Sequence, residues 1–558
     1  MRIVPPVLAA VSLFALTLGA APAQRFFADD PLAREPESQD ASRAQPSDVG
    51  LLFDVAFDLF ATSRREPGTT RAGNVNTIDE VPDSSWFTNR ILARPIGVDE
   101  LARGPSTGTP PNPERWIVIR EKSAGASPGF TATDASGETW FISFDSPKNP
   151  EAATAAIVVA NKFFWALGYN QVETFLTKVD PSRITIDPSA TVRRPNGKKT
   201  PMRRDDLNAV FERAAKSPDG TYRAAAGRQL PGKVLGPFRY EGTRPDDPND
   251  VVDHEHRREL RALRVFGAWT NLTDLKAGNT LDTLVTVNGR GVVRHYLQDV
   301  GSTFGIGANG PHDYDEGFEY VYQGVASRKR LATLGFALSP WQTADYPDFP
   351  SIGRFESDKF DPAKWKPHSP TTGYMEMQPG DAFWAARRVA AFSSEDIRAI
   401  VRSGQYSDAA AEAYLATTLI RRRDKIAGAY LTAVNPIVNP RLGAGGQLTF
   451  ENAAVSTGAG PAPSGYQSDW QQFDNTTGET RPIGRARGNG PLLDPPAALP
   501  VQAGDMVQID VWSEAPGPGA HPIRLHFRRA ASGWTLIGLD RNAVQPASQT
   551  TPAGRSPR

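Results

Sequence analysis

The chain has 558 residues, of which 39% are hydrophobic and 22% charged, so it can bury the cores of two or three domains and is not disordered throughout. Its 62 basic side chains balance 62 acidic ones, which removes any overall attraction to nucleic acid or to an anionic membrane. It contains no cysteine, which excludes disulfides, thiolate metal sites, a lipid-modified cysteine and a cysteine nucleophile.

The N-terminal residues fit a secretory signal. Residues 1–23 contain one basic residue, Arg2, then the apolar run VLAAVSLFALTLGA and the small-residue pattern Ala21-Pro22-Ala23. The apolar run is shorter than the roughly 18–20 residues that a membrane span requires, which favours a cleaved signal over an anchor. We therefore expect an exported protein, periplasmic or extracellular, whose mature chain has no membrane span.

Composition and periodicity divide the remaining chain into parts and predict an α+β fold. They are a polar, proline-punctuated linker at 24–50, an N-terminal helix and extended segment at 51–115, two parts at 116–245 and 246–437, a small all-β sandwich at 438–545 and a disordered tail at 546–558. Within residues 246–437 a long helix ends near Trp269 and an NGRG turn at 288–291 predicts a β-hairpin. Two further helices are expected at 379–403 and 408–434.

One motif on the loop before that hairpin carries chemistry. It is Asp274-Leu275-Lys276-Ala277-Gly278-Asn279, which resembles the catalytic loop D-L-K-x-x-N of the protein-kinase-like superfamily. In phosphoryl transfer an aspartate accepts the proton of the attacking hydroxyl, a lysine neutralises the transferring phosphoryl group and an asparagine binds magnesium. The resemblance gives these roles to Asp274, Lys276 and Asn279. The alternative is a structural Asx turn and helix cap.

The resemblance extends to both sides of the motif, over about residues 116–434. It implies that 116–245 is an N-terminal lobe and 246–437 a C-terminal lobe. In the family the hairpin ends in a metal-binding aspartate, which implies that Asp299 of Gln298-Asp299-Val300-Gly301 binds Mg²⁺ and that ATP is the nucleotide. Upstream, residues 116–130 resemble the first strand and the glycine-bearing turn over the phosphates, with Gly125 and Gly129. Residues 150–159 resemble the helix whose glutamate orients the ATP lysine, which implies Glu151. The most similar variants are the bacterial toxin kinases of the HipA type and their spore-coat relatives.

The sequence departs from the family where the ATP lysine is expected. Ser143 stands at that position, so Lys122 on the preceding strand or Lys148 just beyond would have to reach the phosphates instead. Leu272 and Thr273 also replace the histidine and arginine that usually precede the catalytic aspartate. Both an active kinase with a displaced lysine and an inactive kinase-like fold are compatible with these changes.

The sequence therefore predicts an exported, two-lobed, kinase-like protein that transfers phosphate from Mg-ATP to a hydroxyl, followed by a β-sandwich. The alternative is a non-catalytic envelope or surface scaffold whose sandwich binds a polymer or partner. In that case the aromatic residues of the sandwich could stack on sugars, although alternating aromatics are more often core residues. These residues are Trp470, Phe473, Trp512 and Trp534. The sequence specifies neither the hydroxyl acceptor nor an oligomeric state.

Four weaker signals are set aside. Gly125–Gly129 spells a nucleophile elbow but lacks the helix that should follow, and Gly305–Gly310 spells a dinucleotide fingerprint with the same defect. Asp253–His256 offers metal-binding types at a helix start, where residues two apart face different sides. The basic run at 193–204 has no interleaved aromatics, so we expect no nucleic-acid partner.

Overall fold

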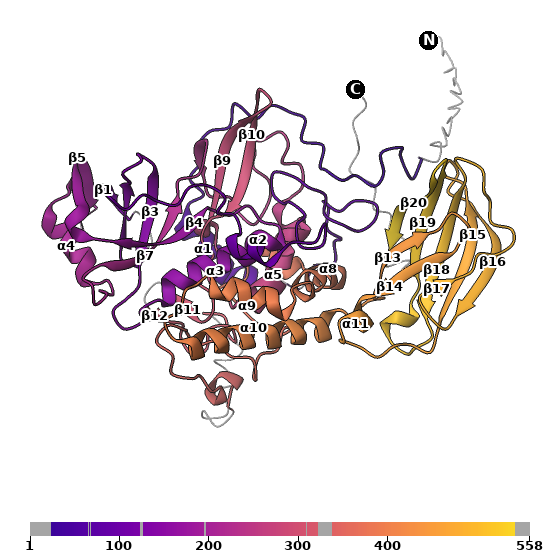
Figure 1. Cartoon of the computed structure of the whole chain (residues 1–558). Coiled ribbons are helices and arrows are strands. Elements are labelled where there is room, and N and C mark those ends of the chain that lie inside the picture. The colour runs from indigo at the N-terminus through magenta and orange to yellow at the C-terminus, as the bar shows by residue number, and fades with distance from the viewer. Residues whose placement is uncertain are drawn as a thin grey trace, which may run out of the picture.

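The computed structural model describes residues 24–541 except 65, 67, 123–126, 195–196, 308–309 and 322–337. The predicted signal peptide at 1–23, the tail at 546–558 and Gly125 lie outside this part of the chain. Figure 1 shows three regions, namely a sheet-rich lobe, a central helical lobe and a separate β domain. Among the described helices none has the length and hydropathy needed to cross a bilayer.

A seven-stranded sheet forms the N-terminal lobe (Figure 1), with the strand order β4-β7-β3-β2-β1-β5-β6. The strands are β1 (Trp116–Glu121), β2 (Gly129–Thr133), β3 (Thr139–Phe144), β4 (Thr174–Val179), β5 (Ile184–Arg193), β6 (Lys199–Pro201) and β7 (Tyr222–Arg228). Strands β1, β2 and β3 form an antiparallel meander, and β5 runs parallel to β1. One face of the sheet packs Phe130 and Phe144 against Phe211 of helix α4 (Arg204–Glu212).

Helix α3 (Ala152–Leu167) follows β3 and lies between the two lobes, where most of its side chains are buried. The carboxylate of Asp145 caps it by accepting the N–H and hydroxyl of Thr154 at 2.8 and 2.7 Å. The helix ends at Gly168, as predicted, because the backbone there takes φ 125° and a Cβ would collide with the ring of Phe87.

The C-terminal lobe is built on helix α5 (Arg258–Thr270), which ends at Asn271 in the left-handed conformation. The loop after it contains a 3₁₀ turn (Ala277–Asn279) and leads into strands β9 (Thr280–Val287) and β10 (Arg290–Leu297). The predicted hairpin is confirmed, since Asn288 and Gly289 both have positive φ in its two-residue turn. Strand β8 (Lys233–Gly236) completes this small sheet.

In the part of this lobe that the structure describes, four helices follow the hairpin, namely α7 (Thr372–Glu376), α8 (Pro379–Ala390), α9 (Ser394–Arg402) and α10 (Ala409–Tyr430). The single helix predicted at 379–403 is therefore two helices. The break occurs because the Ser393 hydroxyl accepts the N–H of Asp396 and the Asp396 carboxylate accepts the N–H of Ser393, a capping box that starts a new helix.

The C-terminal domain is all-β, as predicted. A sheet of β16 (Thr480–Gly488), β15 (Tyr466–Phe473), β18 (Met506–Ser513), β19 (Ile523–Ala530) and β20 (Gly533–Asp540) packs with a second sheet of β13 (Ile437–Leu442), β14 (Leu448–Asn452) and β17 (Leu492–Leu493). Their shared core includes Trp470, Ile509 and Leu525. The α+β class with a small C-terminal β domain is thus confirmed. Helix α11 (Ala453–Ser456) is a single turn between strands.

Residues 24–50 are not a free linker. Phe26 packs at the sandwich against Phe473 and His526, with ring centroids 6.0 and 4.9 Å apart. Ala41 and Ala44 are buried against the β8–β10 sheet, so the segment runs from the sandwich to the central lobe (Figure 1). Its few apolar residues show no period, and their contacts are with distant parts of the chain, which composition alone does not reveal.

Candidate functional site

The loop after α5 brings the predicted catalytic residues together. The Lys276 ammonium lies 2.8 Å from the Asp274 carboxylate. The Asn279 side-chain nitrogen donates to the backbone carbonyl of Asp274 at 2.7 Å. Because that bond uses the amide nitrogen, the amide oxygen of Asn279 is the atom that can coordinate a cation.

Asp299 lies beside this loop at the end of β10. Its backbone N–H donates to the carbonyl of Asn279 at 3.0 Å, so the two predicted metal ligands come from adjacent segments. One carboxylate oxygen of Asp299 accepts the N–H of Gly301 at 3.0 Å, which fixes the side chain. A carboxylate and an amide oxygen are the donor types that Mg²⁺ prefers, so these residues fit the metal.

Lys122 fills the place of the lysine that β3 lacks. Its ammonium is 3.3 Å from the hydroxyl of Ser143, the residue at the family's lysine position. Glu121 pairs with Phe130 and Gly129 with Ser143, so Gly129 lies between Lys122 and Ser143 across the sheet. A Cβ on Gly129 would collide with the backbone of Ile142 and lie 3.3 Å from Lys122 Cδ. The lysine therefore crosses β2 where a glycine leaves room.

The charge of Lys122 faces the candidate metal site. Burial lowers the pKa of its ammonium, and the nearby negative charge of Asp299 opposes that effect. A half-buried lysine near one carboxylate can also bind further negative charge, such as the phosphates of a nucleotide. Lys148, the other lysine considered from the sequence, is exposed.

Glu151 occupies a different place from the one that the resemblance implies. It precedes α3 with φ 66°, and its carboxylate accepts the N–H of Ser407 at 2.8 Å. Ile157 of α3 faces the segment that begins at Asp299, because a Cβ added to Gly301 would lie only 2.8 Å from the Ile157 side chain. The structure thus does not pair Glu151 with Lys122, because α3 begins after Glu151 and turns an aliphatic side chain to the site. Of the two predicted turn glycines, Gly129 lies in β2 and Gly125 lies outside the described residues.

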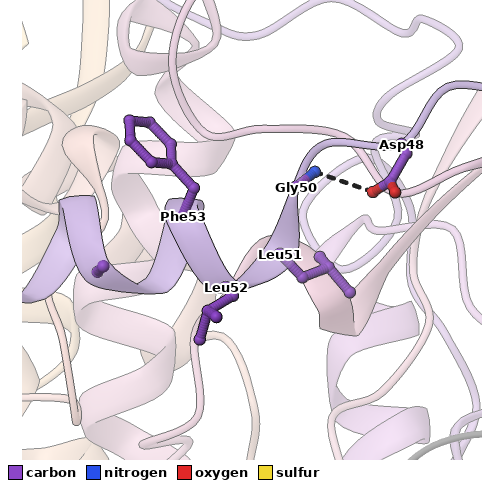
Figure 2. A pocket seen from close by; sticks show the side chains of 6 residues that line it. Asp48, Gly50, Leu51, Leu52 and Phe53 are labelled. Carbon is purple, nitrogen blue, oxygen red and sulfur yellow. Dashed lines mark hydrogen bonds between the residues drawn. The ribbon is translucent and has the colours of Figure 1, made fainter. Parts of the chain in front are cut away.

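Helix α1 (Leu51–Phe60) covers one side of the catalytic loop. A Cβ on Gly278 would lie 3.5 Å from Leu51, and the Asp54 carboxylate accepts the N–H of Ala277. Figure 2 shows Leu51, Leu52 and Phe53 projecting from the first turn, where Gly50 donates to Asp48 at 2.9 Å. The faces of α1 are the reverse of those of an ordinary amphipathic helix. Its carboxylates face the protein, while Leu52 and Phe53 are 85% and 73% exposed.

Sequence reasoning missed three side chains that hold this loop. Thr273, Glu316 and His368 form a hydrogen-bonded group next to Asp274. Glu316 follows the fingerprint-like segment and His368 lies within a proline-flanked stretch, and no spacing rule connects either with Thr273.

The metal-ligand types at Asp253–His256 are brought together in the fold. One ligand atom from each of Asp253, Glu255 and His256 lies within 4.8 Å of the others. These groups already bind the protein, because Arg261 is 2.6 Å from His256 Nδ1 and the Glu255 carboxylate accepts the N–H of Gly242 at 2.7 Å. They serve as structural contacts at the start of α5.

No family model and no curated protein sequence matches the chain. Among solved structures, it is similar to the Golgi casein kinase with Mn/ADP bound, with TM-score 0.28 and 11% identity over 59% of this chain and 76% of that one. It is also similar to the Helicobacter pylori proinflammatory kinase CtkA, with TM-score 0.30 and 12% identity over 57% of this chain and 95% of that one. Since these scores are low, the case for kinase chemistry rests on the side chains described above.

Proposed function

We propose that this chain is a Mg-ATP-dependent phosphotransferase that acts on a hydroxyl, with Lys122 as its phosphate-binding lysine. The observation that carries the proposal is the contact of the Lys122 ammonium with Ser143 beside Asp299. A scaffold that had lost nucleotide chemistry would have no need to hold a half-buried cation there, because removing a charge from water costs free energy.

The remaining roles follow from the chemistry of each group. Asp274 accepts the proton of the acceptor hydroxyl, and Lys276, already paired with it, stabilises charge on the phosphoryl oxygens. Asn279 and Asp299 hold Mg²⁺, which when bound neutralises the nucleotide phosphates. Lys122 then binds those phosphates from the N-terminal lobe.

A thermal-shift titration with Mg-ATP tests the nucleotide site. A ligand present at 100 times its dissociation constant stabilises the folded state by about 2.7 kcal/mol and so raises the melting temperature. We expect this shift in the wild type and its loss in Asp299→Ala and Lys122→Ala. Lys148→Ala is the matched control, since that exposed lysine contributes nothing to the site.

A lysine swap tests the displaced lysine directly. In Lys122→Ala/Ser143→Lys the cation returns to β3, opposite the same carboxylate, and we expect a partial recovery of the Mg-ATP shift. If wild-type protein shows no shift at millimolar Mg-ATP, the phosphotransferase proposal fails and the scaffold alternative replaces it. If Lys122→Ala keeps the full shift, another group binds the phosphates.

Export is proposed on the sequence pattern of residues 1–23, with cleavage after Ala23. Expression of the full chain in a secreting bacterium, followed by mass analysis of the extracytoplasmic fraction, should give a protein that begins at Gln24. Intact protein with Met1 retained in the cytoplasm would contradict export.

A further inference from the structure

The residue before the catalytic aspartate is held from two sides. The hydroxyl of Thr273 donates to the Glu316 carboxylate at 3.0 Å, and the backbone N–H of His368 donates to the Thr273 carbonyl at 2.9 Å. His368 Nε2 and the same Glu316 oxygen are 2.6 Å apart, which closes a ring of three hydrogen bonds. Thr273 is completely buried, so both of its polar groups depend on these partners.

The same carboxylate also reaches the loop that follows Asp299. His312 Nδ1 lies 3.4 Å from Glu316, and His312 Nε2 lies 3.0 Å from the hydroxyl of Ser302. The two segments that form the candidate site, one ending in Asp274 and one beginning at Asp299, are therefore connected through one glutamate.

The charges of Glu316 and the two histidines strengthen the hydrogen bonds that join the two segments. The hydrogen bond and charge of Glu316 outweigh burial and raise the pKa of His368, while Asp274 raises it further and Lys276 opposes them. Burial works against the ionised form of Glu316, but the hydrogen bond with His368 and the charges of both histidines lower its pKa to about 2. Glu316 is thus ionised at neutral pH, and hydrogen bonds to an ionised acceptor are stronger than neutral ones.

We infer that Glu316, with His368 and Thr273, is a positioning residue that holds the Asp274 loop in its catalytic geometry. They hold the loop although Leu272 and Thr273 stand where the resembled family has a histidine and an arginine. The inference rests on the proposed function, and it gives these side chains a supporting role instead of contact with the nucleotide or the acceptor.

Thr273 offers a matched pair of variants for the test. Thr273→Val removes the hydroxyl but keeps the branched shape, whereas Thr273→Ser keeps the hydroxyl. The rate of ADP formation from Mg-ATP, with water as acceptor, is measured for both and for Glu316→Ala. We expect Thr273→Val and Glu316→Ala to lower kcat about tenfold or more with KM for Mg-ATP changed less than about twofold, and Thr273→Ser to recover most of kcat.

Hydrogen–deuterium exchange over residues 272–279 gives a readout that does not depend on turnover. It should be faster in Thr273→Val and Glu316→Ala than in Thr273→Ser or the wild type, while exchange in the β-sandwich stays unchanged. Equal exchange in the valine and serine variants would overturn the positioning role. Absence of ADP formation by the wild type would instead overturn the proposed function, whatever the exchange of the loop.

Discussion

At the scale of single residues, the most informative feature of the site is its lysine. The resembled family has this lysine on β3, whereas here Lys122 comes from the end of β1. Ser143 alone suggests that nucleotide chemistry has been lost. Lys122 comes directly after β1, which is separated from β3 by β2, and its side chain reaches Ser143 across Gly129 of β2. A cation can thus arrive at the same place from a different backbone position, which sequence alignment by position would miss.

Gly129→Ala tests this arrangement. A methyl group there would collide with the backbone of Ile142, so we expect the free energy of unfolding to fall by about 1–3 kcal/mol and the Mg-ATP shift to weaken as Lys122 moves. Urea denaturation and thermal shift measure the two effects. Gly428→Ala is the control, because it lies in helix α10 with nothing within 4 Å and should raise stability by about 0.5–1 kcal/mol. A Gly129→Ala protein as stable as the wild type would contradict the crowding.

Site residues that lie close together in the sequence could be predicted, whereas those that lie far apart could not. Asp274, Lys276 and Asn279 lie within one turn of chain and Asp299 follows a short hairpin, so motif and turn chemistry could place them near one another. Glu151 could not be placed in this way, because which face of α3 meets the site depends on how the helix packs between the lobes. The three hydrogen-bonded residues Thr273, Glu316 and His368 are joined only by the fold.

At the scale of elements, helix α1 shows that hydrophobic periodicity does not decide which face is buried. The sequence predicts a helix in this segment, in which apolar and acidic residues alternate. In the structure Asp54 is half-buried and lies toward Arg239 and Ala277, whereas Leu52 and Phe53 face outward. The hydrogen bond from the Ala277 N–H decides the orientation, since an unpaired buried donor costs more than an exposed leucine.

Substitutions in α1 should follow this inverted polarity. Leu52→Asn and Phe53→Asn should change the free energy of unfolding by no more than about 0.5 kcal/mol, because both side chains are already in solvent. Asp54→Ala should cost about 1–3 kcal/mol by leaving the Ala277 N–H without its acceptor. Urea unfolding of the three variants gives the comparison, and the reverse ranking would show that the apolar face is the buried one.

At the scale of the whole molecule, a network of charges joins three regions. Arg258 of α5 binds Asp79 at 2.8 Å and Asp381 of α8 at 2.9 Å. Arg541, after the last strand of the sandwich, lies 3.7 Å from the same Asp79. Since both arginines are buried, loss of the shared carboxylate would leave uncompensated charge in the interior. The extended N-terminal segment thus acts as a connector between lobe and sandwich.

The pH dependence of stability is also a property of the whole molecule. Burial, with the charges of Arg25 and Arg524, lowers the pKa of His526 in the sandwich to about 3, and burial lowers that of His312 in the central lobe to about 4. Because these folded-state pKa values lie below the unfolded value, the unfolded chain binds protons first as the pH falls. The stabilisation is therefore complete above about pH 6.5 and is lost progressively below it.

His526→Phe should remove part of this dependence while keeping an aromatic ring against Phe26 and Phe473. Between pH 6.5 and 4.5 we expect the wild type to lose about 2–3 kcal/mol more unfolding free energy than the variant. Guanidinium denaturation at the two pH values measures the difference. Parallel losses in the two proteins would mean that His526 titrates normally.

The sequence by itself determined the features that depend on neighbouring residues, namely the α+β class, the β-hairpin at 288–291, the end of α3 at Gly168 and the short run from Asp274 to Asn279. Turn glycines, helix caps and local spacing act over a few residues, so the residues next to them in the sequence are enough to predict the structure that they form. The tertiary structure alone decided that Lys122 reaches Ser143 and that Glu316 supports Thr273. It also decided that Ile157, and not Glu151, faces the segment that begins at Asp299. Each of these contacts joins segments far apart in the chain, and the packing of lobes and helices fixes them.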